Sequence, residues 1–264
     1  MEENMSAKLE GRVAIITGAG RGLGKIFATR FAEEGAKLLL PDISLERSEA
    51  TAKAIRTKGG QAIAMELDIS NDVAVQKMAE MVISHYGKVD ILLNNAAMFY
   101  GVRHRPWDSW KADDWKQMFA VNVTGTWLCC KAIAPLMIKQ SKGKIINIAS
   151  LAGLKGLGLS THYCAAKHGL LGFTKALAME VANHNIHVNA VCPGTVESIS
   201  LEGIAAQTGL EGEPYQHFSQ GHLFQDRRIT PEDIARAVRW LASEDSRCVT
   251  GAVLSVDAGW SARG

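Results

Sequence analysis

The chain has 264 residues and a net charge of +2, and 47% of its residues are hydrophobic. This length and composition predict one soluble globular domain with a substantial core. Acidic and basic residues are interspersed, without the basic blocks of nucleic-acid-binding proteins or a polybasic stretch suited to membranes. No apolar run approaches the ~18 residues of a membrane span, and the acidic start lacks a secretory-signal pattern. We therefore expect a cytoplasmic protein with neither nucleic acid nor a membrane as partner.

The five cysteines lack the spacing of metal ligands. Cys129 and Cys130 are adjacent, so on a helix they point to different sides and cannot clamp one ion together. We expect no bound metal. Buried thiols in a reducing compartment account for this cysteine content.

Short apolar runs alternate with helix-length segments along the whole chain. Strands are predicted at 13–17, 37–40, 62–67, 89–93, 144–148, 186–191 and 252–256. Helices are predicted at 22–34, 44–58, 72–86, 111–139, 162–182 and 231–242. Repeated β-α-β units predict an α/β fold, a doubly wound parallel sheet in three α/β/α layers, as a single domain over residues 1–264. Two segments without clear periodicity, 98–111 and 197–228, are predicted substrate loops.

A glycine-rich turn, Thr17-Gly-Ala-Gly-Arg-Gly-Leu-Gly24, follows the first predicted strand and opens the first predicted helix. Its glycines permit a tight turn, close backbone approach and close helix–sheet packing. The helix N-terminus then offers free N–H groups and a partial positive charge to a pyrophosphate. The turn therefore predicts a dinucleotide site that includes Gly18, Arg21, Gly22, Leu23 and Gly24.

The choice between NAD and NADP depends on Asp42, eighteen residues beyond Gly24 at the end of the second predicted strand. Its carboxylate can accept from both adenosine ribose hydroxyls of NAD. At ~4 Å and an effective dielectric of ~20, repulsion of a 2′-phosphate costs ~4 kcal/mol, or about three decades of affinity. Arg21 favours a 2′-phosphate, but Ile43 and Ser44 add no second basic residue. We predict NAD, with NADP less favoured.

Tyr163 and Lys167 lie four residues apart, on one face of a predicted helix, with Ser150 thirteen residues before the tyrosine. A phenol has a pKa of ~10, but an ammonium a few ångströms away contributes ~4 kcal/mol, enough to lower that pKa to ~7. Ser150 follows a strand, where its hydroxyl can hydrogen-bond a substrate oxygen. These residues predict proton transfer at a carbonyl or alcohol.

The chain resembles the short-chain dehydrogenase/reductase family over roughly residues 8–259. The matching motifs are Thr17-Gly-x-x-x-Gly-x-Gly24, Asp68, Asn94-Asn-Ala96, Asn122, Ser150, Tyr163-x-x-x-Lys167 and Pro193-Gly194. The resemblance implies a homotetramer, in agreement with predicted helices that are apolar on more than one face.

The resemblance also implies a role for each matching position. Asp68 and Ile69 contact the adenine, and Asn95 and Ala96 border the adenosine ribose. Asn122 holds a helix kink and a water that relays protons to Lys167, which also binds the nicotinamide ribose. The nicotinamide is implied to lie among Pro193, Gly194, Val196 and Ser198, where Ser198 replaces the family's usual threonine.

The expected substrate is a medium-sized secondary alcohol or its ketone, because leucines follow Ser150 and aromatic residues fill the first irregular loop. In that loop Arg103, His104 and Arg105 either contact an anionic group or lie in solvent. The main hypothesis is an NAD-dependent alcohol dehydrogenase. The first alternative is an NADPH-dependent ketone or 3-oxoacyl reductase. The second, a non-catalytic dinucleotide-binding module, is disfavoured by the complete set of reacting residues.

Overall fold

Seven parallel strands form one sheet in the order β3-β2-β1-β4-β5-β6-β7. They are β1 (Val13–Ile16), β2 (Lys37–Asp42), β3 (Gln61–Glu66), β4 (Ile91–Asn94), β5 (Gly143–Ile148), β6 (Ile186–Pro193) and β7 (Val253–Val256). The computed structural model describes residues 8–99, 105–197, 215–216 and 219–263. The predicted doubly wound α/β sheet is confirmed.

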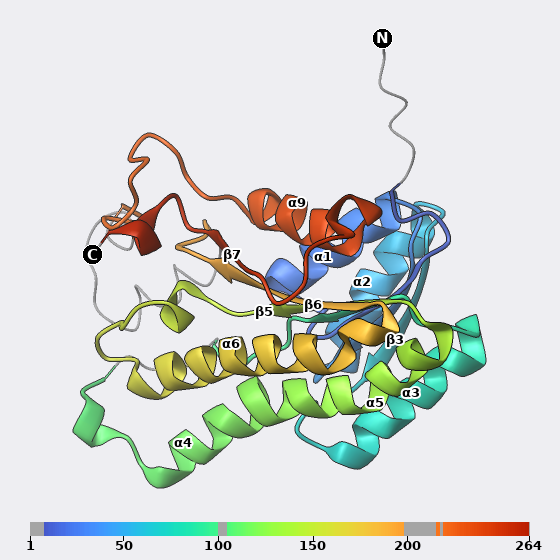
Figure 1. Ribbon diagram of the computed structural model, residues 1–264, viewed down its shortest axis with the longest axis horizontal. Helices are drawn as coiled ribbons and strands as arrows, with labels where there is room; N and C mark the ends of the chain where they lie inside the picture. Colours follow the sequence, from blue (N-terminus) through green and yellow to red (C-terminus); the bar gives the residue numbers. More distant parts are fainter. Residues whose placement is uncertain (1–7, 100–104, 198–214, 217–218, 264) are drawn as a thin grey trace.

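Helices cover both faces of the sheet, and the central strands β1 and β4 are therefore buried throughout (Figure 1). One layer contains α1 (Gly22–Glu33), α2 (Leu45–Thr57) and α9 (Pro231–Ala242). The other contains α3 (Asp72–Tyr86), α5 (Thr126–Gln140) and α6 (Thr161–Val181). Each layer packs a separate apolar core against the sheet, so the strands and their carboxyl-end loops are held from both sides.

The helix predicted at 111–139 is interrupted. α4 (Ala112–Phe119) leads into a π-helical turn, η2 (Ala120–Gly125), and then into α5. Within the described part of the chain, Ala112–Gln140 is the one helical stretch long and apolar enough to cross a membrane, and 56% of its apolar window is buried in the fold. Its contacts with α3, β4 and β5 are those of a core helix.

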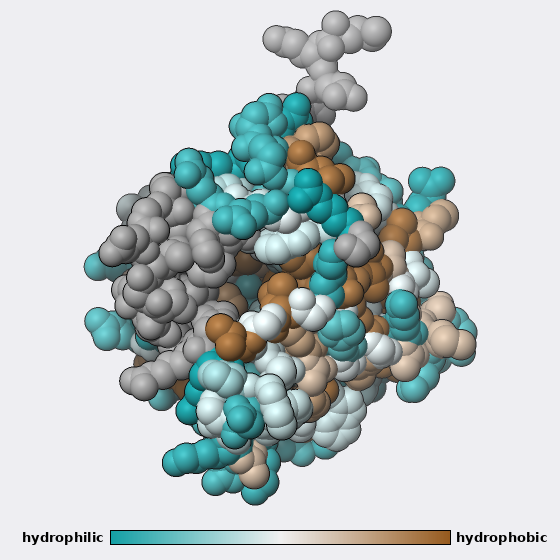
Figure 2. All heavy atoms as spheres, turned by 90° about the vertical axis from the view of Figure 1, so that its left-hand side faces the viewer, coloured by the Kyte–Doolittle hydropathy of each residue, from teal (hydrophilic) through white to brown (hydrophobic). Residues whose placement is uncertain are grey.

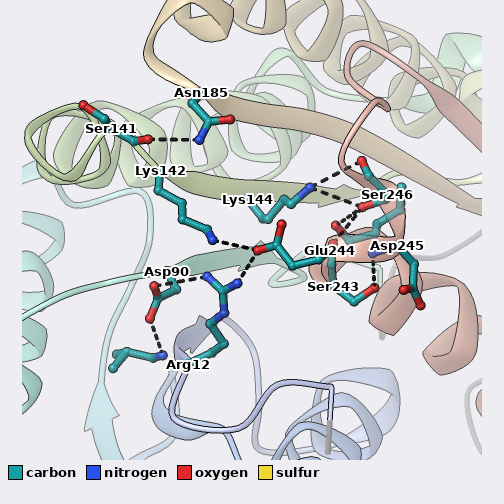
Figure 3. Close-up of polar contacts among 12 residues, drawn as sticks. Arg12, Asp90, Ser141, Lys142, Lys144, Asn185, Ser243, Glu244, Asp245 and Ser246 are labelled. Atoms are coloured by element: carbon teal, nitrogen blue, oxygen red, sulfur yellow. Dashed lines mark hydrogen bonds and ion pairs between the residues drawn. The ribbon is translucent and has the colours of Figure 1, made fainter. Parts of the chain in front are cut away.

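A network of ion pairs joins the amino ends of three strands (Figure 3). The Arg12 guanidinium lies 3.5 Å from the Asp90 carboxylate and also pairs with Glu244, whose carboxylate lies 2.8 Å from Lys142 Nζ. The hydrogen bond from Lys142, and then that from Arg12, outweigh burial and lower the pKa of Glu244 to about 2. The ion pairs of Glu244 therefore stabilise the fold at neutral pH, and this stabilisation is lost as pH falls towards 2 and the carboxylate becomes protonated. It contributes at most about 1 kcal/mol to the free energy of unfolding, because Glu244 is half-exposed.

All five cysteines are free thiols; four are buried and Cys248 is exposed. Burial raises the pKa of Cys129, and it raises that of Cys130 to about 12. These two thiols are therefore protonated, apolar core groups at neutral pH. Among the described residues, no group of three His, Cys, Asp or Glu side chains is arranged to hold a metal ion.

Candidate active site

The sheet reverses its winding between β1 and β4, and the loops after these two strands meet there. The Thr17 hydroxyl accepts hydrogen bonds from the Asn95 and Ala96 N–H groups, both at 3.0 Å. The Asn95 side-chain amide donates to the carbonyls of Thr17 and Gly18 at 3.0 and 3.1 Å. In doubly wound sheets this position is where ligands bind. The structure thus brings two predicted cofactor segments together.

The glycine turn is so closely packed that side chains would not fit. A Cβ at Gly18 would lie 2.8 Å from the Ala96 Cα, and one at Gly24 only 2.1 Å from the Gly18 carbonyl oxygen. Gly18 and Gly22 also have positive φ, 68° and 53°, which favours glycine. The N-cap of α1 is Arg21, whose guanidinium has only donors and cannot satisfy the first N–H groups of the helix. A bare backbone cradle and a helix N-terminus fit a pyrophosphate.

Gly24→Ala is expected to weaken dinucleotide binding by about tenfold or more and to lower the melting temperature. The added methyl group overlaps backbone, and overpacking of this kind costs about 1–3 kcal/mol. Calorimetric titration with cofactor and thermal denaturation measure both effects. Gly172→Ala in α6 is the control, because no atom lies within 4 Å of its added Cβ. Unchanged cofactor affinity in Gly24→Ala would contradict the placement of the phosphates at this turn.

Asp42 ends β2 and is buried. Its Oδ2 accepts from the Gly20 N–H at 2.9 Å, and its Oδ1 accepts from the Ser44 N–H at 2.9 Å. Ser44, rather than Asp42, caps α2 by accepting from the Arg47 N–H at 3.4 Å. Asp42 therefore binds the glycine turn and does not serve as the N-cap of α2.

A second basic residue lies near Asp42 in space, although Ile43 and Ser44 follow it in the sequence. Arg47 Nη2 donates to Asp42 Oδ1 at 3.1 Å. Five residues separate the two, but the first turn of α2 brings the guanidinium back over the end of β2. The signal available in the sequence was Ser44 as N-cap, which fixes where that turn begins.

Ser150, Tyr163 and Lys167 come together at the carboxyl end of β5. Ser150 follows that strand and begins the short helix η3 (Leu151–Gly153), where its Oγ accepts from the Ala152 N–H at 3.1 Å. Tyr163 and Lys167 lie in the first turns of α6. The side chain of Tyr163 is hydrogen-bonded with that of Ser150, and buried Lys167 Nζ donates to the Ile148 carbonyl at 2.8 Å.

The electrostatics of this group differ from the prediction. Burial raises the pKa of Tyr163, and the hydrogen bond with Ser150 only partly opposes it. Burial also lowers the pKa of Lys167 to about 8. The prediction that the Lys167 ammonium lowers the pKa of Tyr163 is therefore wrong for the chain by itself. Lys167 Nζ lies 5.7 Å from the centre of the Tyr163 ring, and desolvation of the hydroxyl outweighs its influence.

Asn122 lies in η2 and is buried. Its Oδ1 accepts from the Met98 N–H at 2.7 Å, and its Nδ2 donates to the Met98 carbonyl at 3.2 Å. These bonds tie the π-helical turn to the loop after β4. The next residue, Phe99, places its ring centre 5.3 Å from that of Tyr163. The helix distortion thus fixes the loop that covers the tyrosine.

The remaining predicted cofactor residues follow β3 and β6. Asp68 is exposed and accepts from Ser70, whereas Ile69 is buried. Gly194 follows Pro193, and a Cβ on it would lie 2.8 Å from the Asp257 Cα. Val196 forms a parallel bridge with Ile229. Ser198 lies outside the described residues.

The described part of the first irregular loop packs against the start of α6. The Arg105 guanidinium donates to Asp114 at 3.0 Å and lies 4.2 Å from the Trp110 ring centre. Trp110 in turn has its ring centre 3.7 Å from that of buried His162. Arg105 therefore has partners within the protein, whereas Arg103 and His104 lie outside the described residues.

The described part of the second loop packs against the C-terminal segment. The Leu223 N–H donates to the Ala258 carbonyl at 2.8 Å, and Lys155 Nζ, just after η3, donates to the Trp260 carbonyl at 3.5 Å. Figure 2 looks onto this side of the molecule, where apolar atoms gather between polar margins. The sequence reasoning did not find this contribution of the C-terminal segment.

Comparison with known proteins agrees with this geometry. The family model described as "Enoyl-(Acyl carrier protein) reductase" matches residues 18–261. A 3-oxoacyl-(acyl-carrier-protein) reductase of Thermotoga maritima is 35% identical over 96% of this chain and 98% of its own length. The chain belongs to the short-chain dehydrogenase/reductase family. It is therefore an NAD(P)-dependent oxidoreductase that acts on CH–OH and keto groups.

Solved short-chain dehydrogenase/reductase structures superpose closely. The crystal structure of levodione reductase has a TM-score of 0.91 and 31% identity, covering 97% of this chain and 100% of that one. Carveol dehydrogenase from Mycobacterium avium, solved in complex with NAD, has a TM-score of 0.89 and 30% identity, covering 96% and 98%. The predicted family and fold are confirmed.

Proposed function

We propose that the protein is an NAD(H)-preferring dehydrogenase/reductase of a medium-sized secondary alcohol or ketone, with Tyr163 as its general acid and base. The observation that carries the proposal is the meeting of Ser150, Tyr163 and Lys167 at the end of the sheet that also holds the glycine turn. The proposed catalytic residues are Asn122, Ser150, Tyr163 and Lys167.

In the proposed reaction each polar side chain has one task. Bound nicotinamide supplies or accepts the hydride. The Tyr163 hydroxyl donates its proton to the substrate oxygen during reduction and takes it back during oxidation, while the Ser150 hydroxyl donates a hydrogen bond to that oxygen. Lys167 binds the nicotinamide ribose, and Asn122 holds a water that relays protons to it. Burial raises the pKa of Tyr163, so the protein by itself holds this hydroxyl in the protonated form that reduction requires.

Asp42 supports NAD(H) as the preferred cofactor, because its buried carboxylate lies beside the Gly20 N–H. The similarity to a carveol dehydrogenase solved with NAD points the same way. The cofactor residues that we propose are Gly18, Arg21, Gly22, Leu23, Gly24, Asp42, Asp68, Ile69, Asn95, Ala96, Tyr163, Lys167, Pro193, Gly194, Val196 and Ser198.

The substrate is proposed from the apolar character of the surroundings. Phe99 packs on Tyr163, and Leu151, directly after Ser150, is buried. The loops 98–111 and 197–228 are proposed to complete the pocket. A second candidate, an NADPH-dependent 3-oxoacyl reductase, is favoured by the relative of that name and by Arg47 beside Asp42.

Absorbance at the NADH band tests the proposal. Purified protein is mixed with NAD⁺ and a panel of secondary alcohols, and in parallel with NADPH and a panel of ketones and 3-oxoacyl thioesters. We expect NADH to form with at least one alcohol. Turnover of 3-oxoacyl thioesters with NADPH alone would favour the second candidate. No turnover in either panel would contradict both.

We also propose a cytoplasmic homotetramer. A groove on the outer side of α5 and α6 is lined by Trp127, Pro135, Phe173 and Leu177, among others. Trp127 is 45% exposed, and Met179 on the same helix pair is 84% exposed. A second copy of the chain would cover this apolar surface. Light scattering after gel filtration measures the assembly, and Trp127→Glu is expected to dissociate it.

A further inference from the structure

The carboxylate of Asp42 is largely occupied by the protein itself. Oδ2 accepts from Gly20, and Oδ1 accepts from both Ser44 and Arg47, at 2.9, 2.9 and 3.1 Å respectively. An ionised carboxylate has about four acceptor positions, so three are filled. One position is left for a ribose hydroxyl, whereas Asp42 was expected to accept from both adenosine ribose hydroxyls.

Arg47 is held at the edge of the phosphate turn. A Cβ added to Gly20 would lie 2.7 Å from the Arg47 Cβ, so the arginine stem packs directly on the turn. The Arg47 side chain is 40% exposed, and its Nη2 donates one hydrogen bond to Asp42. A guanidinium has five N–H donors in a planar fork that suits phosphate. Arg47 therefore has donors to give to a ligand at this edge.

We propose that Arg47 is a cofactor-specificity residue that admits a 2′-phosphate on the adenosine ribose, so that the protein binds NADP(H) as well as NAD(H). The inference rests on the proposed dinucleotide binding and deepens it. Asp42 alone repels a 2′-phosphate by about three decades of affinity, but a cation at a comparable distance opposes that repulsion with the same magnitude. With the two contributions opposed, the affinities for NAD(H) and NADP(H) are expected to lie within about tenfold of each other.

Calorimetric titration of the purified protein with NAD⁺, NADP⁺, 5′-AMP and 2′,5′-ADP tests the inference without any turnover. The wild-type Kd for NADP⁺ is expected within about tenfold of that for NAD⁺. Arg47→Gln is expected to weaken NADP⁺ and 2′,5′-ADP at least tenfold and to leave NAD⁺ and 5′-AMP within about threefold. Arg56→Gln is the matched control, because Arg56 is an equally exposed, ion-paired arginine of the same helix.

Salt provides a measurement that needs no variant. Between about 0.05 and 0.5 M salt, the wild-type affinity for NADP⁺ should fall at least threefold more than that for NAD⁺, because a phosphate–arginine contact is screened. Three results would overturn the role of Arg47 and leave the proposed function standing. They are a ratio of the NADP⁺ and NAD⁺ Kd values that does not change with salt, the same ratio in Arg47→Gln as in the wild type, and binding of NAD⁺ alone by the wild type. Binding of neither nucleotide would overturn both.

Discussion

Tyr163→Phe is expected to lower kcat by about a thousandfold while the cofactor Kd changes by less than about threefold. The substitution removes only the hydroxyl, and general acid–base catalysis contributes about 10²–10⁴ in rate. The ring stays in place against Phe99, so the pocket is retained. Steady-state kinetics with the best alcohol or ketone and calorimetry with cofactor separate the two effects.

Tyr86→Phe is the matched control. The Tyr86 hydroxyl donates to the Leu38 carbonyl at 3.1 Å, and it lies on α3. Loss of that bond should lower stability by about 1 kcal/mol and leave kcat unchanged. Retained turnover in Tyr163→Phe would remove this hydroxyl from the mechanism and would require a different general acid.

Lys167→Met is expected to lower kcat by at least about a hundredfold and to change how stability depends on pH. Burial lowers the pKa of Lys167 to about 8, below its ordinary value of 10.5. Below pH 8 both folded and unfolded states carry the proton, and the buried charge weakens the fold. Between about pH 8 and 10.5 the folded state has lost the proton and the unfolded state keeps it, so the free energy of unfolding rises with pH.

Urea denaturation from pH 7.5 to 10 measures this effect. The wild type should gain about 2 kcal/mol relative to Lys167→Met over that range, because the other titrating groups are common to both proteins. Lys175→Met, an exposed lysine of the same helix, is the control and should show neither effect. A difference that does not vary with pH would show that Lys167 keeps its charge in the folded protein.

The strands and most helices could be predicted because their signals are local. α3 and α9 begin and end at the predicted residues, since Asn71 and Thr230 provide caps directly before them. The break in the helix at 111–139 could not be predicted by periodicity. The break depends on hydrogen bonds between Asn122 and Met98, two residues that are distant in the sequence. The family resemblance alone implied a kink there.

The candidate site shows the same division. The glycine turn and the Ser150, Tyr163 and Lys167 group could be predicted from residue type and spacing. Their ionisation could not, because the pKa of Tyr163 depends on how deeply the fold buries its hydroxyl. Arg47 was missed because one helical turn, rather than sequence adjacency, brings it to Asp42.

The first and last described segments of the chain lie near opposite ends of the parallel strands, and this affects where a tag is best attached. Lys8 pairs with Asp245, next to the strand-start ion pairs of Figure 3. Trp260, by contrast, is hydrogen-bonded to Lys155 beside the Ser150 turn. The segment around Trp260 therefore lies close to the proposed catalytic residues, whereas the segment around Lys8 lies at the amino ends of the strands. A tag for purification or immobilisation should therefore be attached on the N-terminal side of the chain.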